Sequence, residues 1–390
     1  MIWIRELAGP RARYRVASIA ATIGFVTLLV ASTCYCFLRP RATIDSIAYV
    51  SIAEGSSENT FKSDLESCNG ELPGEHKGCG DLSSNLFAEV GGYSAQDYQT
   101  WLRLYENKPL FNFLLKILHR DLHISAFLSL RAVSAVSFLG LSIVIWFWLR
   151  EYLSLVASSL MASFVMCLKL TLEMGQNLLP DGLSTALLLL AAYLLLYRKN
   201  KWLGAIALVL LPLVRPDNII FVFFFAGALI LRRALPAKIR ASLVVLLGLG
   251  CVLFNFVLQK AVHALPWPVL YQQSFGPRTT PSEFAGYHLL LSQYVHGLVA
   301  YGSLSLLVNF PPILFFAVLA LAEKNFWQPL RDLVWASLAA IAVRLLLFPG
   351  MDERYYAWLF LICVIGATAA FGQFAQSKHS WFGQSEACLP

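Results

Sequence analysis

Long apolar stretches recur along the chain from residue 16 to residue 374, with short polar segments between them. The hydrocarbon core of a bilayer is about 30 Å thick, so a helix needs about 20 residues to cross it. Within that core every backbone polar group must find a partner inside the protein, which favours helices. We therefore expect an all-α integral membrane protein, with residues 1–390 forming a single polytopic membrane domain.

Composition agrees with a membrane location. Hydrophobic residues make up 58% of the chain and charged residues only 14%, and the mean hydropathy is +0.63. A soluble domain usually carries about 25% charged residues, and its core could not hide this much apolar surface. The net charge of +7 is divided among the segments between apolar stretches instead of forming a basic stripe. Membrane lipid is thus an expected partner and nucleic acid is not.

About ten apolar stretches are candidate membrane spans. The first follows a basic segment, as in a signal peptide, but its length and the lack of a small-residue cleavage site predict an uncleaved helix. Two short spans flank Arg215-Pro216-Asp217, a polar break that is tolerated only where it is buried in protein or lines a wet cavity. The candidate spans are 16–38, 123–148, 152–172, 180–197, 202–214, 218–231, 241–262, 297–322, 330–348 and 355–374.

The distribution of Lys and Arg predicts the orientation. With the long loop 39–122 left out, the connections on one side contain fifteen of these residues and those on the other side contain three. Because Lys and Arg of short loops are retained in the cytoplasm, both termini should be cytoplasmic and loop 39–122 extracytoplasmic. Short loops with both termini inside suit a bacterial inner (plasma) membrane.

The extracytoplasmic loop 39–122 is expected to contain juxtamembrane helices. Apolar residues at helical spacing predict helices at 43–54 and 94–105. In the segment 109–120 an apolar stripe with basic residues beside it predicts an amphipathic helix in the membrane interface.

Residues 55–92 of this loop are rich in Gly, Ser and acidic groups and should be irregular. Cys68 and Cys79 lie in this polar segment and are expected to form a disulfide, provided that this side is oxidising. A zinc site with His76 would lack a fourth ligand, so no metal site is predicted here.

Charged side chains gather at the outer ends of the expected spans. Charges at membrane depth are costly, so a functional role is their default interpretation. A transporter would instead be expected to place them near the midplane on broken helices. The gathering favours a site at the membrane surface that a lipid reaches from the side. Its members are Asp45, Lys108, Glu173, Asp181, Arg215, Asp217, Asp352, Glu353 and Arg354.

Several motifs resemble those of one enzyme superfamily. The segment from Asp45 to Ala53 resembles the Asp-x-x-x-Tyr-x-x-x-Ala signature of the GT-C glycosyltransferases, which include protein O-mannosyltransferases and aminoarabinose transferases of lipid A. Lys108-Pro109-Leu110 resembles the Lys-Pro-Pro-Leu segment of that superfamily. The series is completed by Arg131-Ala132-Val133-Ser134, Pro180-Asp181-Gly182, Arg215-Pro216-Asp217 and Glu353-Arg354-Tyr355-Tyr356.

The resemblance implies transfer of a sugar from a polyprenyl-phosphate (or diphosphate) donor to a glycan, lipid or protein acceptor. Such a transfer needs a base for the acceptor hydroxyl and positive charge for the leaving phosphate. Asp45 is the implied base, and Tyr49, one helical turn later, shares its face. The further substrate-binding residues that we expect are Lys108, Asp181, Arg215, Glu353, Arg354 and Tyr355.

The chain departs from the family pattern at two positions. Many members carry a second acidic residue directly after the first, whereas this chain has Ser46, and the second proline of Lys-Pro-Pro is Leu110. These differences argue against the mannosyl and aminoarabinosyl branches. They also leave open whether a divalent cation is required, and no other cofactor is expected.

Structural interpretations compete at several of these positions. Asp45 and Asp181 each occur where a helix is expected to begin, so either could serve as a cap. Lys169 and Glu173 are four residues apart and could simply neutralise each other. The break at 215–217 could be purely structural, with Asp217 as a cap.

Two other function classes compete with a glycosyltransferase. One is a transporter or flippase of lipid-linked sugars, which the lack of visible repeats and midplane charges disfavours. The other is a non-catalytic subunit of a glycan-assembly complex. The composition of loop 263–296 further suggests a mobile lid over the acceptor.

Overall fold

The computed structural model describes residues 10–55, 95–198, 201–275, 284, 287–322, 328–350 and 352–386. Every regular element in these ranges is helical, and their only strand-like feature is an isolated bridge between Arg41 and Asn177. The prediction of an all-α protein is therefore confirmed for the described ranges.

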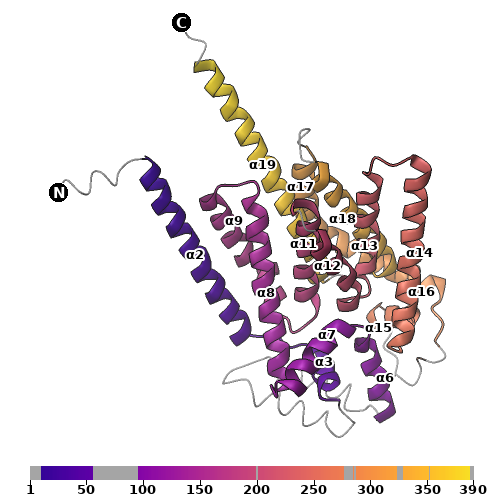
Figure 1. Cartoon of the computed structure of the whole chain (residues 1–390). Coiled ribbons are helices and arrows are strands. Elements are labelled where there is room, and N and C mark those ends of the chain that lie inside the picture. Colours follow the sequence, from indigo (N-terminus) through magenta and orange to yellow (C-terminus); the bar gives the residue numbers. More distant parts are fainter. Residues whose placement is uncertain are drawn as a thin grey trace.

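Most of the helices form a bundle, and a smaller group of helices covers one end of it (Figure 1). Each of the ten predicted spans coincides with one helix or with a consecutive pair. The elements are α2 (Pro10–Leu38), α3 (Ile44–Glu54), α6 (Ala95–Glu106), α7 (Pro109–Lys116), η1 (Ile117–Asp121), α8 (Ala126–Arg150), α9 (Leu155–Cys167), α10 (Lys169–Gln176), α11 (Asp181–Tyr197), α12 (Lys201–Val214), α13 (Asn218–Leu231), α14 (Ala237–Ala261), α15 (Trp267–Phe275), α16 (Leu291–Gly297), η3 (Leu298–Gly302), α17 (Ser303–Ala322), α18 (Gln328–Leu347), η4 (Glu353–Tyr355) and α19 (Ala357–Glu386).

Three helices are long and apolar enough to cross a membrane on their own: α2 from Tyr14 to Leu38, α8 and α14. Two bent pairs would each make one further span, namely α9 with α10, bent by 65°, and Leu291–Gly302 with Leu306–Ala322, bent by 56°. Helices α11, α12 and α13 are apolar but shorter. By length and composition the described residues thus provide three to five spans, and a total of ten stays a prediction.

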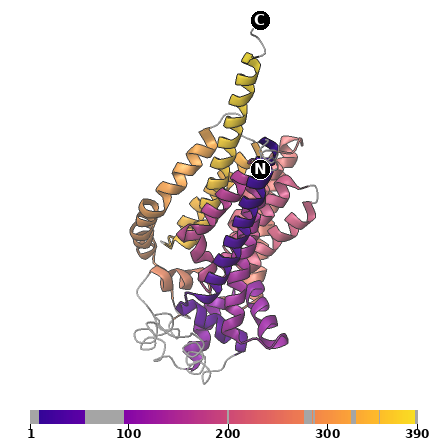
Figure 2. The ribbon, with the colours of Figure 1, turned by 90° about the vertical axis from the view of Figure 1, so that its left-hand side faces the viewer.

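The two ends of the bundle differ. Figure 1 and Figure 2 show that α2 begins and α19 ends at the same end, while α3, α6 and α7 lie together at the opposite end. The helix expected at 109–120 is present: α7 ends at Lys116 and continues as the π-helical segment η1 to Asp121. Its Phe111 and Leu115 are fully buried, and Phe113 is exposed.

Helix α8 lies at the centre of the bundle. It packs against α2, α9, α10 and α11, and 56% of its most apolar 18-residue stretch is buried. Its Ser129, Ser134, Ser137 and Ser142 are all buried. Small side chains let membrane helices approach one another closely, which explains how one helix can contact so many others.

Two glycines allow the close approach of α8, α10 and α11. A Cβ at Gly175 of α10 would lie 2.7 Å from the Cβ of Phe138 on α8. A Cβ at Gly182 of α11 would lie 2.5 Å from the backbone oxygen of Met174. A larger side chain at either position would push the helices apart. The packing therefore determines where α11 begins, and with it the position of Asp181.

Candidate functional site

Asp45 lies in the first turn of α3 but does not cap the helix. The N-cap is Thr43, whose backbone N–H donates to Oγ of Ser46 at 3.0 Å. Ser46 Oγ in turn donates to the carbonyl of Leu178 at 3.3 Å. The alternative that Asp45 is a cap is therefore wrong. Ser46 stabilises the helix start, and the Asp45 carboxylate is left for other partners.

The Asp45 carboxylate has two partners among the described residues. Tyr105 on α6 donates its hydroxyl to Oδ1 at 2.9 Å, and Nη2 of Arg354 lies 3.7 Å from Oδ2. Burial and the neighbouring Asp45 charge raise the pKa of Tyr105 well above its ordinary value, so its hydroxyl remains a donor. A carboxylate can accept about four hydrogen bonds. Asp45 therefore retains room for a further donor.

Lys108 lies directly before α7, where Pro109 occupies the first helical position. Its ammonium is 5.2 Å from the ring centroids of both Tyr49 and Tyr105, within the range of cation–π attraction. None of the ion pairs within the described ranges involves Lys108. Burial and then the charge of Arg215 lower the pKa of Lys108 from the ordinary 10.5 to about 7. A bound anion would favour its charged form.

Tyr49 forms a wall of the site. It is buried, and its ring packs edge-on against Tyr105 and Phe111 with centroids 5.6 and 5.0 Å apart. The helical spacing predicted that Tyr49 shares a face with Asp45, and its contact with Tyr105, the hydrogen-bond donor to Asp45, agrees with that prediction.

The break between α12 and α13 contains paired charges. Arg215 makes two contacts of 3.1 Å with the Asp217 carboxylate and also pairs with Asp181 at the start of α11. Arg344 on α18 approaches Asp217 from another helix, at 2.7 Å. The Asp217 side chain makes no cap hydrogen bond. The polar break is partly buried, with 14% of the Arg215 side chain and 30% of the Asp217 side chain exposed, and its charges join α11, α13 and α18.

Tyr355 lies among three arginines. The guanidinium carbons of Arg215, Arg344 and Arg354 are 5.0, 4.6 and 5.1 Å from its ring centroid. The negative face of an aromatic ring attracts cations, so the ring helps to hold like charges close together. Arg354 also lies 3.8 Å from Asp181, which connects the paired charges to Asp45.

We refer to these ionisable groups together as the charged cluster. Its cations outnumber its carboxylates by one. Asp352 also lies 2.9 Å from Arg354, but its side chain is 59% exposed and largely screened by water. The surplus positive charge beside Asp45 suits a singly charged anion such as a phosphodiester. The members are Lys108, Arg215, Arg344 and Arg354 against Asp45, Asp181 and Asp217.

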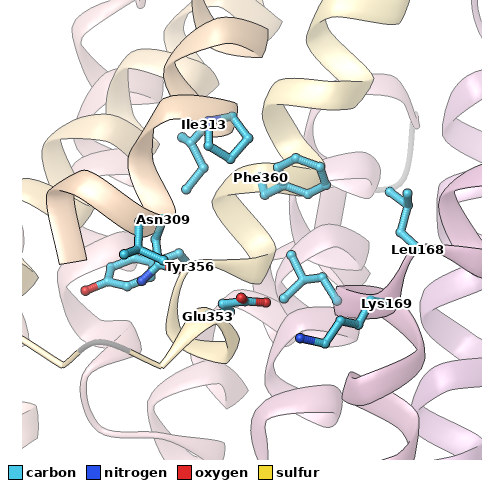
Figure 3. A pocket seen from close by; sticks show the side chains of 10 residues that line it. Leu168, Lys169, Asn309, Ile313, Glu353, Tyr356 and Phe360 are labelled. Carbon is cyan, nitrogen blue, oxygen red and sulfur yellow. The ribbon is translucent and has the colours of Figure 1, made fainter. Parts of the chain in front are cut away.

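Glu353 does not join the charged cluster. It lines a cavity of about 280 Å³ between α10, α17 and α19, called here the α10–α17 cavity. Figure 3 shows Lys169 and Glu353 at one end of it and Ile313 and Phe360 at the other. The cavity is thus polar at one end and apolar at the other, and Arg354 follows Glu353 directly in the chain.

Glu173 also lies outside the charged cluster. The predicted pair with Lys169 is present at 3.8 Å, but Glu173 is closer to Arg41, at 2.5 Å. The side chains of Lys169 and Arg41 are 73% and 53% exposed. The neutralising role expected for Lys169 is therefore shared with Arg41.

Arg131, in another of the family-like motifs, stabilises the end of α2. Its Nε and Nη2 both donate to the backbone carbonyl of Phe37, at 2.9 and 2.5 Å. The last carbonyls of a helix lack partners within the helix, so this arginine satisfies one of them.

Most of the predicted site residues come together, although they are far apart in the sequence. Those in or beside the charged cluster are Asp45, Tyr49, Lys108, Asp181, Arg215, Arg354 and Tyr355. Sequence reasoning missed Tyr105 and Arg344. A sequence signal existed for Arg344, an arginine near the end of an apolar helix. Cys68, Cys79 and most of the segment 55–92 lie outside the described residues.

Within the described ranges no three His, Cys, Asp or Glu side chains converge as a metal site requires. No family model, curated protein or solved structure matches the chain. The fold and the site together define a helical protein with helices long and apolar enough to span a membrane and with ionisable groups gathered at one end of its bundle.

Proposed function

We propose that the protein is a glycosyltransferase of the GT-C type. It moves a sugar from a polyprenyl-phosphate or polyprenyl-diphosphate donor to a glycan, lipid or protein acceptor. The observation that carries the proposal is the environment of Asp45: a carboxylate with one hydroxyl donor and one guanidinium at 3.7 Å, beside a surplus of cations. A base and positive charge for the departing phosphate are what this transfer needs.

In this reaction Asp45 takes the proton of the acceptor hydroxyl while the hydroxyl oxygen attacks the anomeric carbon of the donor sugar. The bond between that carbon and the phosphate oxygen breaks, and the lipid phosphate leaves with one more negative charge. Lys108 and Arg354 stabilise this charge, the arginine through its forked donors. Tyr105 holds the Asp45 carboxylate in position through its 2.9 Å hydrogen bond.

The other members of the site position these groups. Asp181 pairs with both Arg215 and Arg354, and the Tyr355 ring contacts both guanidinium groups. The α10–α17 cavity has apolar side chains at one end, which suit the first isoprene units of a lipid donor, and Lys169 beside Glu353 at the other, where the ammonium attracts the phosphate.

The proposed enzyme is a multi-pass protein of about ten spans in a bacterial inner membrane. Its termini are in the cytoplasm and its charged cluster is on the extracytoplasmic face. The Lys and Arg distribution supports this orientation. It is also supported by the position of the cluster, at the end of the bundle opposite the start of α2 and the end of α19.

The test is transfer of radiolabelled sugar by purified protein from a panel of polyprenyl-phosphate and polyprenyl-diphosphate donors. Wild type is compared with Asp45→Asn and with the matched control Asp352→Asn, which removes the other, more exposed carboxylate near Arg354. Parallel reactions with EDTA decide whether a divalent cation is required.

We expect label to reach the acceptor with wild type and Asp352→Asn but not with Asp45→Asn. Equal transfer by all three proteins would remove Asp45 as the base. If a donor binds to wild type and is moved across vesicle membranes without being consumed, the protein is a flippase and not a transferase. Binding with neither transfer nor movement would favour a non-catalytic subunit.

A further inference from the structure

Helix α14 is long and apolar but scarcely buried. Only 6% of its most apolar 18-residue stretch is buried, and none of its residues is fully buried. It packs against α13 and stands at the right edge of the bundle in Figure 1. A membrane helix in this position has lipid around most of its circumference.

A cavity of about 900 Å³ lies between α13, α14 and α18. We call it the α13–α18 cavity. Phe224 and Arg232 both line it, and their separation of eight residues along α13 corresponds to about 12 Å. The cavity is therefore charged near the end of α13 and aromatic further in. Its lining residues include Arg232, Gln328 and Asp332 at the polar end, and Phe223, Phe224, Val244 and the 53% exposed Trp335 further along the helices.

The segment that follows α13, beginning with the cavity-lining Arg232, is basic. The segment 232–240 contains four cations, Arg232, Arg233, Lys238 and Arg240, and no acidic residue. Arg232 pairs with Asp332 of α18. However, Nη2 of Arg232 and Nε of Arg240 are buried without a hydrogen-bond partner in the described part of the chain. Buried donors normally have acceptors, and neither nitrogen finds one among the described residues, which leave out 323–327 directly before α18.

We propose that the α13–α18 cavity binds one anionic phospholipid. Its phosphate lies at Arg232 and the upper part of its acyl chains lies against Phe224 and Trp335. Basic recesses between membrane helices favour acidic headgroups, and the volume falls within the range of about 300–1,000 Å³ that is typical of ligand sites. A zwitterionic lipid has the same acyl chains but no net negative charge, so the headgroup charge is what would make the cavity prefer the anionic lipid. The site lies at the opposite end of the bundle from the charged cluster and does not depend on the proposed transferase activity.

Trp335 provides a local reporter, because bromine on a lipid chain quenches tryptophan fluorescence on contact. The full-length protein is placed in phosphatidylcholine vesicles that contain the same fraction of either dibrominated phosphatidylglycerol or dibrominated phosphatidylcholine. The Trp335 signal is the difference between wild type and Trp335→Phe. We expect half-maximal quenching at a roughly fivefold lower fraction of the anionic lipid.

Variants separate charge recognition from ordinary lipid contact. Arg232→Gln should abolish the preference for the anionic lipid, and Asp332→Asn should strengthen it. If Arg232→Gln does not fold, the double variant Arg232→Gln, Asp332→Asn takes its place, because it removes both members of the ion pair and leaves neither charge unpaired. It should also lack the preference for the anionic lipid. The matched control Arg150→Gln removes an arginine that lines a different cavity and should leave the preference unchanged.

Two outcomes would overturn the proposal. Equal quenching by both lipids would mean that the cavity contacts only bulk lipid. No quenching by either lipid would mean that Trp335 is covered by something else, such as a second copy of the chain.

Discussion

Asp217 and Asp45 are two carboxylates at the same end of the bundle with nearly equal exposure, 30% and 27% of their side chains. Asp217 is held by three contacts of 2.7–3.1 Å from two arginines. Asp45 has one hydroxyl donor at 2.9 Å and one guanidinium only at 3.7 Å. The two residues therefore differ in pairing and not in burial.

In the proposed mechanism this difference separates a structural carboxylate, Asp217, from the proposed base, Asp45. Burial alone would raise the pKa of Asp217, but Arg215 and Arg344 outweigh it and hold the pKa well below its ordinary value. A carboxylate paired so completely is a poor proton acceptor, and its removal takes an ion-pair partner from Arg344 and leaves Arg215 with Asp181. Asp45 has acceptor capacity to spare and few contacts that folding depends on.

The largest expected effect is that of Asp45→Asn on activity. Loss of a general base lowers a rate by about 10²–10⁴-fold. The amide can still accept the Tyr105 hydroxyl, so the thermal unfolding temperature should stay close to that of wild type. Both quantities are measured on the same preparation. If the unfolding temperature falls together with the activity, the role of Asp45 is structural. Asp45 and Asp217 would then not differ in function.

The second effect is that of Asp217→Asn on stability. Removing one partner of a buried ion pair costs about 3–5 kcal/mol. Because Asp217 is 30% exposed, we expect a smaller loss of about 2 kcal/mol. Denaturant or thermal unfolding in detergent measures it, with the exposed Asp352→Asn as the control. Unchanged stability together with lost activity would assign Asp217 to catalysis instead.

The third effect is a pH dependence of donor binding that comes from Lys108, whose pKa is lowered to about 7. A phosphodiester donor keeps one negative charge throughout the range, so only the protein titrates. Affinity should fall by up to about tenfold per pH unit above pH 7, as the empty site loses its proton. Lys108→Met should bind weakly at pH 6 and show no such slope. Parallel binding curves for the two proteins would contradict the assignment.

The same lowered pKa has a consequence for the empty protein. Folding disfavours the charged form of Lys108, so the destabilisation is absent above pH 10.5 and complete below about pH 7. Lys108→Met should therefore raise the unfolding temperature at pH 6 more than at pH 9. Lys116→Met, at the last residue of α7, provides the control.

The smallest effect is expected from Lys169→Gln. Lys169 is 73% exposed, and Glu173 keeps Arg41 as its closer partner. Exposed ion pairs contribute about 0–1 kcal/mol, so the unfolding temperature should hardly change. A large loss of donor binding in this variant would instead point to the polar end of the α10–α17 cavity, where Lys169 faces the same space as Glu353.

Much of the architecture could be predicted from the sequence. Hydropathy located all ten apolar stretches, and each coincides with a helix or a helix pair. Apolar spacing located α3, α6 and the start of α7 to within one or two residues. The polar break at 215–217 was recognised because charges cannot interrupt an apolar stretch without a partner. These features depend on a few consecutive residues, so the local sequence is sufficient to find them.

The pairing of charges required the tertiary structure. Nothing near Asp45 in the sequence indicates that Tyr105, 60 residues away, donates a hydrogen bond to it. Nor does the sequence indicate that the side chain of Ser46, and not that of Asp45, accepts the hydrogen bond from the backbone N–H of Thr43 at the helix start. The choice of Arg344 as the second partner of Asp217 depends on how α13 packs against α18. Hydropathy and helical period are local and follow from the solvent and the backbone. Which carboxylate is neutralised and which is left available depends on distances of a few ångströms between helices, and these are determined only when the whole bundle packs.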